Sequence, residues 1–310
     1  MKVLVVSGFL GAGKTTFIKS LAAKTGKAFA ILENEYGEAD IDLGELKGVQ
    51  ASGGVGIWEL TEGCICCTRK ADFAASVLTI ANAADPEYLV VEPTGLGRLS
   101  SIMSELKQIE YERITLLAPV TVVDGRGFWR QLREYPGIFT DQVSQAGSVF
   151  VSKLESASPE EKQYLAARLR EINPGASVHT EHYSVMEREE WLSLLTRRHD
   201  GSRLEESGGA DEEMPDAYSI SGAWMDSAES LVLLMEGMAR GEFGDMIRAK
   251  GSVRAGDRDF RFDMAGGRYC ITGADGAAAG KAVFIGKGLR RSRIRRYVMT
   301  GVPRPHGRNR

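Results

Sequence analysis

The first half of the chain alternates short apolar runs with stretches whose apolar residues recur at helical spacing. Apolar runs predict buried strands at residues 3–6, 28–32, 88–91, 114–123 and 149–151. Helices are predicted at 15–23, 71–83 and 159–172, the last opened by Ser158 as N-cap and closed before Asn173-Pro174-Gly175. This alternation favours an α/β fold with a mostly parallel sheet that is flanked by helices.

The pattern changes at residues 200–216, which carry glycine and acidic residues and little apolar content. We interpret this segment as a linker between a domain at 1–199 and a second domain at 217–310. Strands are predicted in the second domain at 217–221, 250–254, 260–264, 268–272 and 283–285, and a helix at 228–239. We expect a small α+β domain, with Cys270 in its core.

Composition narrows the class of protein. The 310 residues are 43% hydrophobic and 26% charged, as in ordinary globular proteins. The net charge of -3 argues against a protein whose main task is nucleic-acid binding. No apolar run approaches membrane length, and the first residues do not read as a signal peptide. We therefore expect a cytoplasmic protein without nucleic acid or membrane as a partner.

Residues 8–15 match the phosphate-loop pattern G-x-x-x-x-G-K-[ST] between a predicted strand and a predicted helix. Backbone N–H groups of such a loop cradle phosphate oxygens, and the helix N-terminus adds partial positive charge. Lys14 is expected to bridge the outer phosphates and Thr15 to hold Mg²⁺. The predicted phosphate-binding residues are Gly8, Gly11, Ala12, Gly13, Lys14, Thr15 and Thr16. An ordinary glycine turn before a helix is the alternative interpretation.

Glu92 ends the apolar run at 88–91 and is followed by Pro93, Thr94 and Gly95. A carboxylate at this position can hold the Mg²⁺ shell or orient water, and a simple capping role is the alternative. The N–H of Gly95 could contact a γ-phosphate and move when that phosphate leaves. Lys14, Glu92 and Gly95 are therefore the candidate catalytic residues.

A candidate base-reading segment, Ser152-Lys153-Leu154-Glu155, follows the strand at 149–151, where GTPases usually carry Asn-Lys-x-Asp. The stem of Lys153 would lie over the base, and Glu155 would accept hydrogen bonds from guanine. Because serine replaces asparagine and glutamate adds a methylene, the segment favours guanine without fixing the preference.

Three of the four cysteines, Cys64, Cys66 and Cys67, fall within four positions. This clustering indicates a metal or redox site in a reducing compartment, since a secreted scaffold would spread its cysteines. Thiolates suit Zn²⁺, Co²⁺ or a related ion, and carboxylates at 33–38 could complete the site. A buried inert turn and a redox pair are the alternatives. Both segments lie between the phosphate loop and Glu92, where a metal could respond to the γ-phosphate.

Two further features carry less information. The four histidines, at 179, 182, 199 and 306, are scattered, and we expect them on the surface or in loops rather than as ligands. Arginines crowd the last part of the chain, from Arg290 to Arg310. A solvated helix face with a frayed tail is the first interpretation, and a contact for an acidic partner is the alternative.

Together these motifs resemble the CobW-type P-loop GTPases, a group that also holds the HypB and UreG metallochaperones. The matching segments are 8–16 (GFLGAGKTT), 33–38 (ENEYGE), 64–67 (CICC), 92–95 (EPTG), 142–153, 248–251 and 283–286. The resemblance covers nearly the whole chain and implies a P-loop NTPase domain followed by the family's C-terminal domain. The His-rich stretch of many relatives is absent from the sequence, which argues against metal storage.

The resemblance also implies site residues and partners. Lys14 and Thr15 would serve the phosphates of GTP and Mg²⁺, and Cys66 with Glu33 and Glu38 are candidate metal ligands, with Cys64 and Cys67 close by. Slow GTP hydrolysis would be modulated by metal and coupled to delivery of Zn²⁺, Co²⁺ or Ni²⁺ to a client metalloprotein. A GTPase assisting a corrinoid-dependent protein and a regulatory module with little turnover are the alternatives. A homo-oligomer is also allowed.

Overall fold

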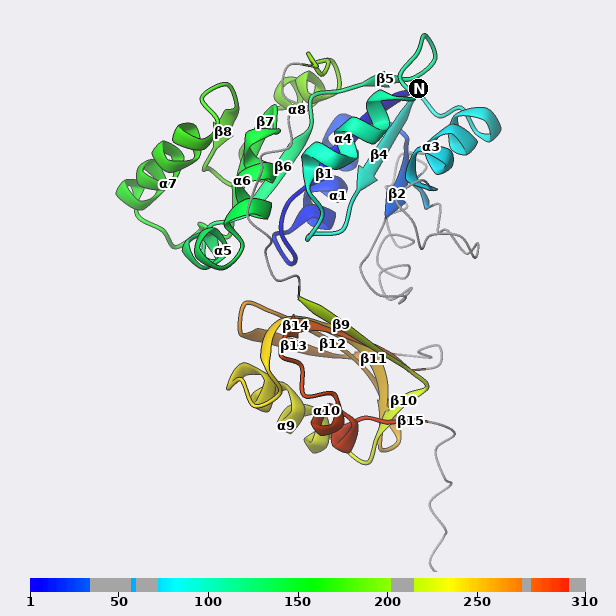
Figure 1. Cartoon of the computed structure of the whole chain (residues 1–310), viewed down its shortest axis with the longest axis vertical. Helices are drawn as coiled ribbons and strands as arrows, with labels where there is room; N and C mark the ends of the chain where they lie inside the picture. The colour runs from blue at the N-terminus through cyan, green and yellow to red at the C-terminus, as the bar shows by residue number, and fades with distance from the viewer. Residues whose placement is uncertain (34–56, 60–71, 202–214, 275–279, 301–310) are drawn as a thin grey trace, which may run out of the picture. The chain divides into compact units, whose positions relative to one another are not determined.

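The computed structural model describes residues 1–33, 57–59, 72–201, 215–274 and 280–300. These residues divide into two compact units, the first ending at 201 and the second beginning at 215 (Figure 1). Residues 202–214, most of the predicted linker, lie outside the described residues. The linker and the domain limits at 199 and 217 therefore stay predictions.

A parallel sheet forms the centre of the first unit. Its strand order is β3-β2-β4-β1-β6-β7-β8, with β5 paired to β1, and every pairing is parallel. The strands are β1 Lys2–Ser7, β2 Phe29–Glu33, β3 Ile57–Glu59, β4 Tyr88–Glu92, β5 Thr115–Leu116, β6 Val120–Asp124, β7 Ser148–Ser152 and β8 Ser177–His179. Because β1 lies between β4 and β6, the loop that follows β1 is at the middle of the carboxyl edge.

Helices cover both faces of this sheet, as the sequence predicted (Figure 1). They are α1 Lys14–Thr25, α3 Asp72–Ala83, α4 Leu99–Lys107, α5 Phe128–Glu134, α6 Pro136–Ser144, α7 Pro159–Ile172 and α8 Arg188–Leu194, with a 3₁₀ turn at Tyr183–Val185. Alternate residues of β1 point to opposite faces. Leu4 and Val6 belong to a core cluster with residues of α1 and α8, whereas Val3 and Val5 belong to one with residues of α3 and α4.

Aromatic packing fixes α1 against the sheet. The ring centroid of Phe17 lies 4.8 Å from that of Phe150 on β7 and 5.1 Å from that of Trp191 on α8. All three side chains are fully buried, and burying one such ring contributes about 1.5–3 kcal/mol. Since Phe17 is in the first turn of α1, this cluster holds the start of the helix in place.

Helix α7 has the bounds and the N-cap that the sequence predicted. The hydroxyl of Ser158 accepts a hydrogen bond of 3.2 Å from the backbone N–H of Glu161. The Glu161 carboxylate in turn accepts one of 2.9 Å from the N–H of Ser158. This reciprocal arrangement is a capping box. It gives acceptors to two backbone N–H groups that have none within the helix.

The prediction of one strand over 114–123 is wrong. The segment forms two strands, β5 and β6, which Leu117, Ala118 and Pro119 separate. Pro119 has no backbone N–H to give to a ladder, and the N–H of Ala118 donates instead to the carbonyl oxygen of Arg197 at 2.8 Å. The chain therefore leaves β1 after β5 and rejoins it as β6.

The second unit is a seven-stranded sheet with its helices on one face (Figure 1). Its strands are β9 Asp216–Ser221, β10 Ala223–Met225, β11 Asp245–Ala255, β12 Arg258–Ala265, β13 Arg268–Ala274, β14 Lys281–Lys287 and β15 Met299–Thr300. Its helices are α9 Ala228–Ala239 and α10 Arg291–Tyr297. All pairings are antiparallel except β10 with β11, so the predicted α+β arrangement is confirmed.

The expectation that Cys270 lies in the core is wrong, because the strand has only one buried face. Tyr269 and Ile271 on β13 pack against the core cluster, while Cys270 between them is exposed. Cys270 pairs in register with Asp263 of β12, on the face that the helices do not cover. An apolar residue type on a strand thus says nothing about its face until the phase is known.

Arginines of the C-terminal region hold α10 within the second unit. Arg290 and Arg293 donate to the carbonyl oxygen of Glu242 at 3.3 and 3.1 Å. The Arg293 guanidinium also lies 2.6 Å from the Glu242 carboxylate. Residues 301–310 lie outside the described residues. Among the helices that the structure describes, none has the length and apolar content needed to cross a membrane.

Candidate functional site

Three glycines give the loop after β1 its shape. Gly8, Gly11 and Gly13 have φ values of 138°, 71° and 99°, which L side chains rarely adopt. A Cβ on Gly8 would also lie 2.1 Å from the carbonyl oxygen of Val122. The loop therefore needs glycine at these positions, and it leads directly into α1 at Lys14.

Lys14, Thr15 and Glu92 meet at the end of this loop. The Lys14 ammonium lies 3.7 Å from a carboxylate oxygen of Glu92, and the Lys14 side chain is only 7% exposed. The Thr15 hydroxyl is 3.2 and 3.3 Å from the two carboxylate oxygens. Thr16 follows with an exposed side chain. A cation, a hydroxyl and a carboxylate thus converge at a helix N-terminus, which is a favourable place for an anion with a divalent cation.

The loop after β4 packs directly on the phosphate loop. A Cβ on Gly95 would lie 2.5 Å from the backbone nitrogen of Leu10, so only glycine allows this approach. The Gln142 amide on α6 donates to the carbonyl oxygens of Gly95 and Gly97 at 3.2 and 2.9 Å. The sequence predicted Gly95 but gave Gln142 no role of its own.

The segment after β7 is bonded to the same loop. The Ser152 hydroxyl donates to the carbonyl oxygen of Ala12 at 2.7 Å, and it also lies 3.2 Å from that of Val123. The Lys153 ammonium donates to the carbonyl oxygen of Gly11 at 2.7 Å and forms a 2.7 Å ion pair with Asp124. Glu155 is exposed beyond them. The structure therefore brings the predicted phosphate and base segments together.

Asp124 is a site residue that the sequence left without a role. It ends β6 and is largely buried, as Glu92 ends β4. Its Oδ1 accepts from the backbone N–H groups of Arg126 and Gly127 at 3.0 and 3.2 Å, while Oδ2 binds Lys153. An acid at the end of a second buried strand was the signal that could have identified it.

Residues 2–180, more than half of the chain, match the family described as CobW/HypB/UreG, nucleotide-binding domain. The chain belongs to this CobW/HypB/UreG family. Residues 225–300 match the domain described as Cobalamin synthesis protein cobW C-terminal domain. Both parts of the predicted resemblance are thereby confirmed.

Curated relatives of this CobW/HypB/UreG-family chain include two zinc chaperones of Escherichia coli (strain K12). The chain is 33% identical to the zinc chaperone YeiR over 186 residues, which are 58% of this chain and 55% of YeiR. It is 32% identical to the zinc chaperone YjiA over 186 residues, which are 57% of this chain and 56% of YjiA. In each case the match spans about half the length of the relative.

Among solved structures, the Zn(II)-bound YjiA GTPase from E. coli is similar to this chain, and the superposition covers 96% of this chain and 97% of the YjiA chain. The identity is 20% and the TM-score 0.46. A likeness of this size says nothing about individual site residues.

The candidate transition-metal ligands of this family member fall mostly outside the described residues. These are Glu38, Cys64, Cys66 and Cys67. Glu33 is the last residue of β2, and its backbone pairs in register with that of Glu92 on β4. Within the described ranges, no group of three His, Cys, Asp or Glu side chains could hold a metal ion.

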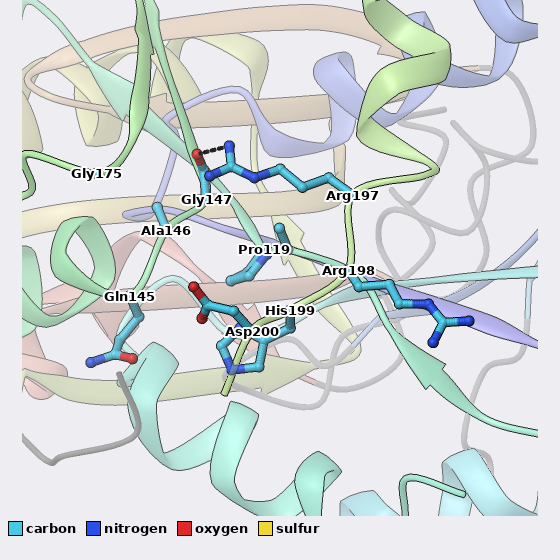
Figure 2. Close-up of a pocket in the computed structure, with 10 residues that line it drawn as sticks. Pro119, Gln145, Ala146, Gly147, Gly175, Arg197, Arg198, His199 and Asp200 are labelled. Carbon is cyan, nitrogen blue, oxygen red and sulfur yellow. Dashed lines mark hydrogen bonds between the residues drawn. The ribbon is translucent and has the colours of Figure 1, made fainter. Parts of the chain in front are cut away.

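A small pocket lies at the opposite, amino edge of the sheet (Figure 2). Its volume is about 60 Å³, and its lining includes Pro119, Gly147 and Gly175, which precede β6, β7 and β8. Figure 2 shows Arg197 donating to the carbonyl oxygen of Gly147, at 2.9 Å. His199 also lines the pocket, and burial lowers its pKa. The sheet separates this pocket from the phosphate loop, so the pocket is not part of the candidate site.

Proposed function

We propose that this protein is a metal-binding GTPase that couples GTP hydrolysis to delivery of a transition metal to a client metalloprotein. Zn²⁺ is the proposed cargo, with Co²⁺ or Ni²⁺ as the other candidates. Support comes from the phosphate loop, from membership of the CobW/HypB/UreG family and from relatives that are named zinc chaperones.

The register between Glu33 and Glu92 carries this proposal. Glu92 faces the phosphate loop through Thr15 and Lys14. Glu33 ends the neighbouring strand at the same level and opens the acidic segment that precedes the three clustered cysteines. Because parallel strands deliver their carboxyl ends to one edge, metal ligands that begin at Glu33 would start beside Glu92, a proposed catalytic residue.

The nucleotide would be held by groups whose geometry is described above. Backbone N–H groups of Gly8, Gly11, Ala12, Gly13 and Thr16 and the ammonium of Lys14 would bind the phosphates. Ser152, Lys153 and Glu155 would form the base site. Gly95, in contact with Leu10, would sense the γ-phosphate through its N–H.

The donors around Thr15 fit Mg²⁺, which prefers hard oxygen ligands. The hydroxyl of Thr15 and the carboxylate of Glu92 lie within 3.3 Å of each other and supply such oxygens. Thr15 and Glu92 would hold Mg²⁺ there, and Mg²⁺ would supply charge neutralisation at the phosphates; orienting the attacking water is the other role open to Glu92. The cargo metal would instead be taken by the softer thiolates of Cys64, Cys66 and Cys67, with the carboxylates of Glu33 and Glu38 as additional ligands.

Hydrolysis of GTP and ATP with Mg²⁺, with and without stoichiometric Zn²⁺ or Co²⁺, tests the proposal. The wild-type protein, Cys66→Ala and Cys270→Ala are compared, because Cys270 is an exposed thiol in the second unit and serves as a matched control. We expect GTP-selective turnover that metal changes in the wild type and in Cys270→Ala but not in Cys66→Ala. Turnover indifferent to metal in all three proteins would remove the metal-delivery part of the proposal.

A further inference from the structure

Arg126 links the two loops that follow β6 and β7, and no motif in the sequence pointed to it. Its Nε donates to the carbonyl oxygen of Lys153 at 3.1 Å, and a terminal nitrogen of the same guanidinium lies 3.6 Å from the carboxylate of Glu155. One planar group therefore contacts both the backbone and the carboxylate of the segment that we propose reads the base.

The position of Arg126 is itself fixed by the turn after β6. Asp124 accepts a hydrogen bond from the backbone N–H of Arg126 and pairs with the ammonium of Lys153. The N–H of Gly125 donates to the carbonyl oxygen of Ser152 at 3.0 Å. A Cβ on Gly125 would lie 2.4 Å from Leu154, so the turn lies directly against the base-reading segment.

Glu155 needs such a contact more than an aspartate would. Its side chain has one more rotatable bond than aspartate, and 56% of it is exposed, so ordering it for a ligand costs conformational entropy. Arginine suits this task, because its planar fork can bind a carbonyl and a carboxylate at the same time, whereas lysine offers a single point charge.

We propose that Arg126 is a positioning residue for guanine recognition, which holds the longer Glu155 side chain at the place where GTPases use aspartate. This inference rests on the proposed GTP-dependent function. Arg126 itself touches no reacting atom. It acts through Glu155, so its removal affects the part of the nucleotide that Glu155 reads and spares the phosphates.

Isothermal titration calorimetry with GDP and IDP, in the presence of Mg²⁺, isolates the contribution of the base to nucleotide affinity. IDP lacks the exocyclic amine that a base-reading carboxylate accepts from, and both ligands share the same phosphates. We expect the wild-type protein to prefer GDP, and Arg126→Ala to reduce the ratio of IDP to GDP dissociation constants about two- to fivefold, the range for an exposed ion pair. The double variant Arg126→Ala with Glu155→Asp should regain preference for GDP, because the shorter side chain needs no clamp.

Arg113→Ala is the matched control. Arg113 also contacts one backbone carbonyl oxygen, that of Ala81, and one carboxylate, that of Asp85, but it lies after α4 at the amino edge of the sheet. The ratio of IDP to GDP dissociation constants in Arg113→Ala should equal that of the wild type.

Two results would overturn the inference while leaving nucleotide binding intact. One is an unchanged ratio in Arg126→Ala, which includes an equal weakening of GDP and IDP. The other is a wild-type protein that binds both ligands equally. A wild-type protein that binds neither GDP nor GTP would instead overturn the proposed function itself.

Discussion

The hydroxyl of Ser152 donates a 2.7 Å hydrogen bond to the carbonyl oxygen of Ala12, 140 positions earlier in the chain. It also lies within hydrogen-bonding distance of the carbonyl oxygen of Val123, the next-to-last residue of β6. One small buried side chain therefore connects β7, β6 and the phosphate loop. Where GTPases usually carry asparagine, this chain has a serine whose hydroxyl bonds to the backbone of the phosphate loop.

Replacing Ser152 with alanine should destabilise the first unit, because the buried carbonyl oxygen of Ala12 loses its donor. A buried acceptor without a partner costs about 1–3 kcal/mol. Calorimetric unfolding should show the midpoint of the first unit lowered by about 3–10 °C, given a few degrees per kcal/mol in a unit of this size. Ser193→Ala removes a local bond at the exposed end of α8 and should change stability by less than about 0.5 kcal/mol. Equal effects of the two substitutions would contradict the role of Ser152.

Replacing Gly95 with alanine should separate the loop after β4 from the phosphate loop. The new Cβ would lie 2.5 Å from the nitrogen of Leu10, and crowding of this kind costs about 1–3 kcal/mol. We expect GTP turnover to fall. We also expect GTP binding to be weakened more than GDP binding, because the loop proposed to contact the γ-phosphate is displaced. Gly273→Ala on β13 meets no atom within 4 Å and should leave both properties unchanged. Wild-type turnover in Gly95→Ala would show that the loop tolerates the displacement.

The hydroxyl of Thr15 should set the requirement for Mg²⁺. Thr15→Ala removes an oxygen that lies 3.2 Å from Glu92, and we expect half-maximal GTP hydrolysis to need at least about tenfold more Mg²⁺. Thr15→Ser keeps the oxygen and should retain most of the wild-type Mg²⁺ dependence. The titration of activity against Mg²⁺ would argue against Thr15 as a ligand if both variants gave the same curve.

The stability of the first unit should fall as pH is lowered through the range where histidine titrates. Burial lowers the pKa of His179, whose ring stacks on Phe150 at 4.4 Å. The unfolded chain therefore binds the proton more readily than the folded chain below about pH 6.5, and protonation favours unfolding. Unfolding midpoints from about pH 7.5 to about pH 5.5 should decline less steeply in His179→Phe than in the wild type. Parallel declines would exclude His179 as a source of this dependence.

Regular elements with strong patterns were predictable from the sequence. Ser158, Pro159 and Glu161 together specify the start of α7, and the apolar run at 149–151 lies wholly within β7. The contiguous phosphate-loop residues were equally readable, because their chemistry depends on local spacing.

Features that depend on distant partners were not predictable in the same way. Asp124 and Gln142 act through hydrogen bonds to residues 29 and up to 47 positions away. Such pairings follow from strand order, which periodicity does not reveal. Cys270 was misplaced for a related reason, because the phase of β13 against the core is set by its pairing with β12. Pro119 was the local sign of the break between β5 and β6, and an apolar run concealed it.

Strand β1 lies between β4 and β6, so the candidate site residues fall into two groups on either side of it. On one side of β1, Glu92 ends β4 and Glu33 ends the neighbouring strand β2. On the other side, Asp124 ends β6, and Ser152 and Lys153 are at and just after the end of β7. Under the proposed function, substitutions that alter base preference would touch different residues from those that alter the response to metal, and their energetic effects should add. Under the same proposal, a lineage could change the nucleotide that it binds while keeping the metal that it delivers, or the reverse.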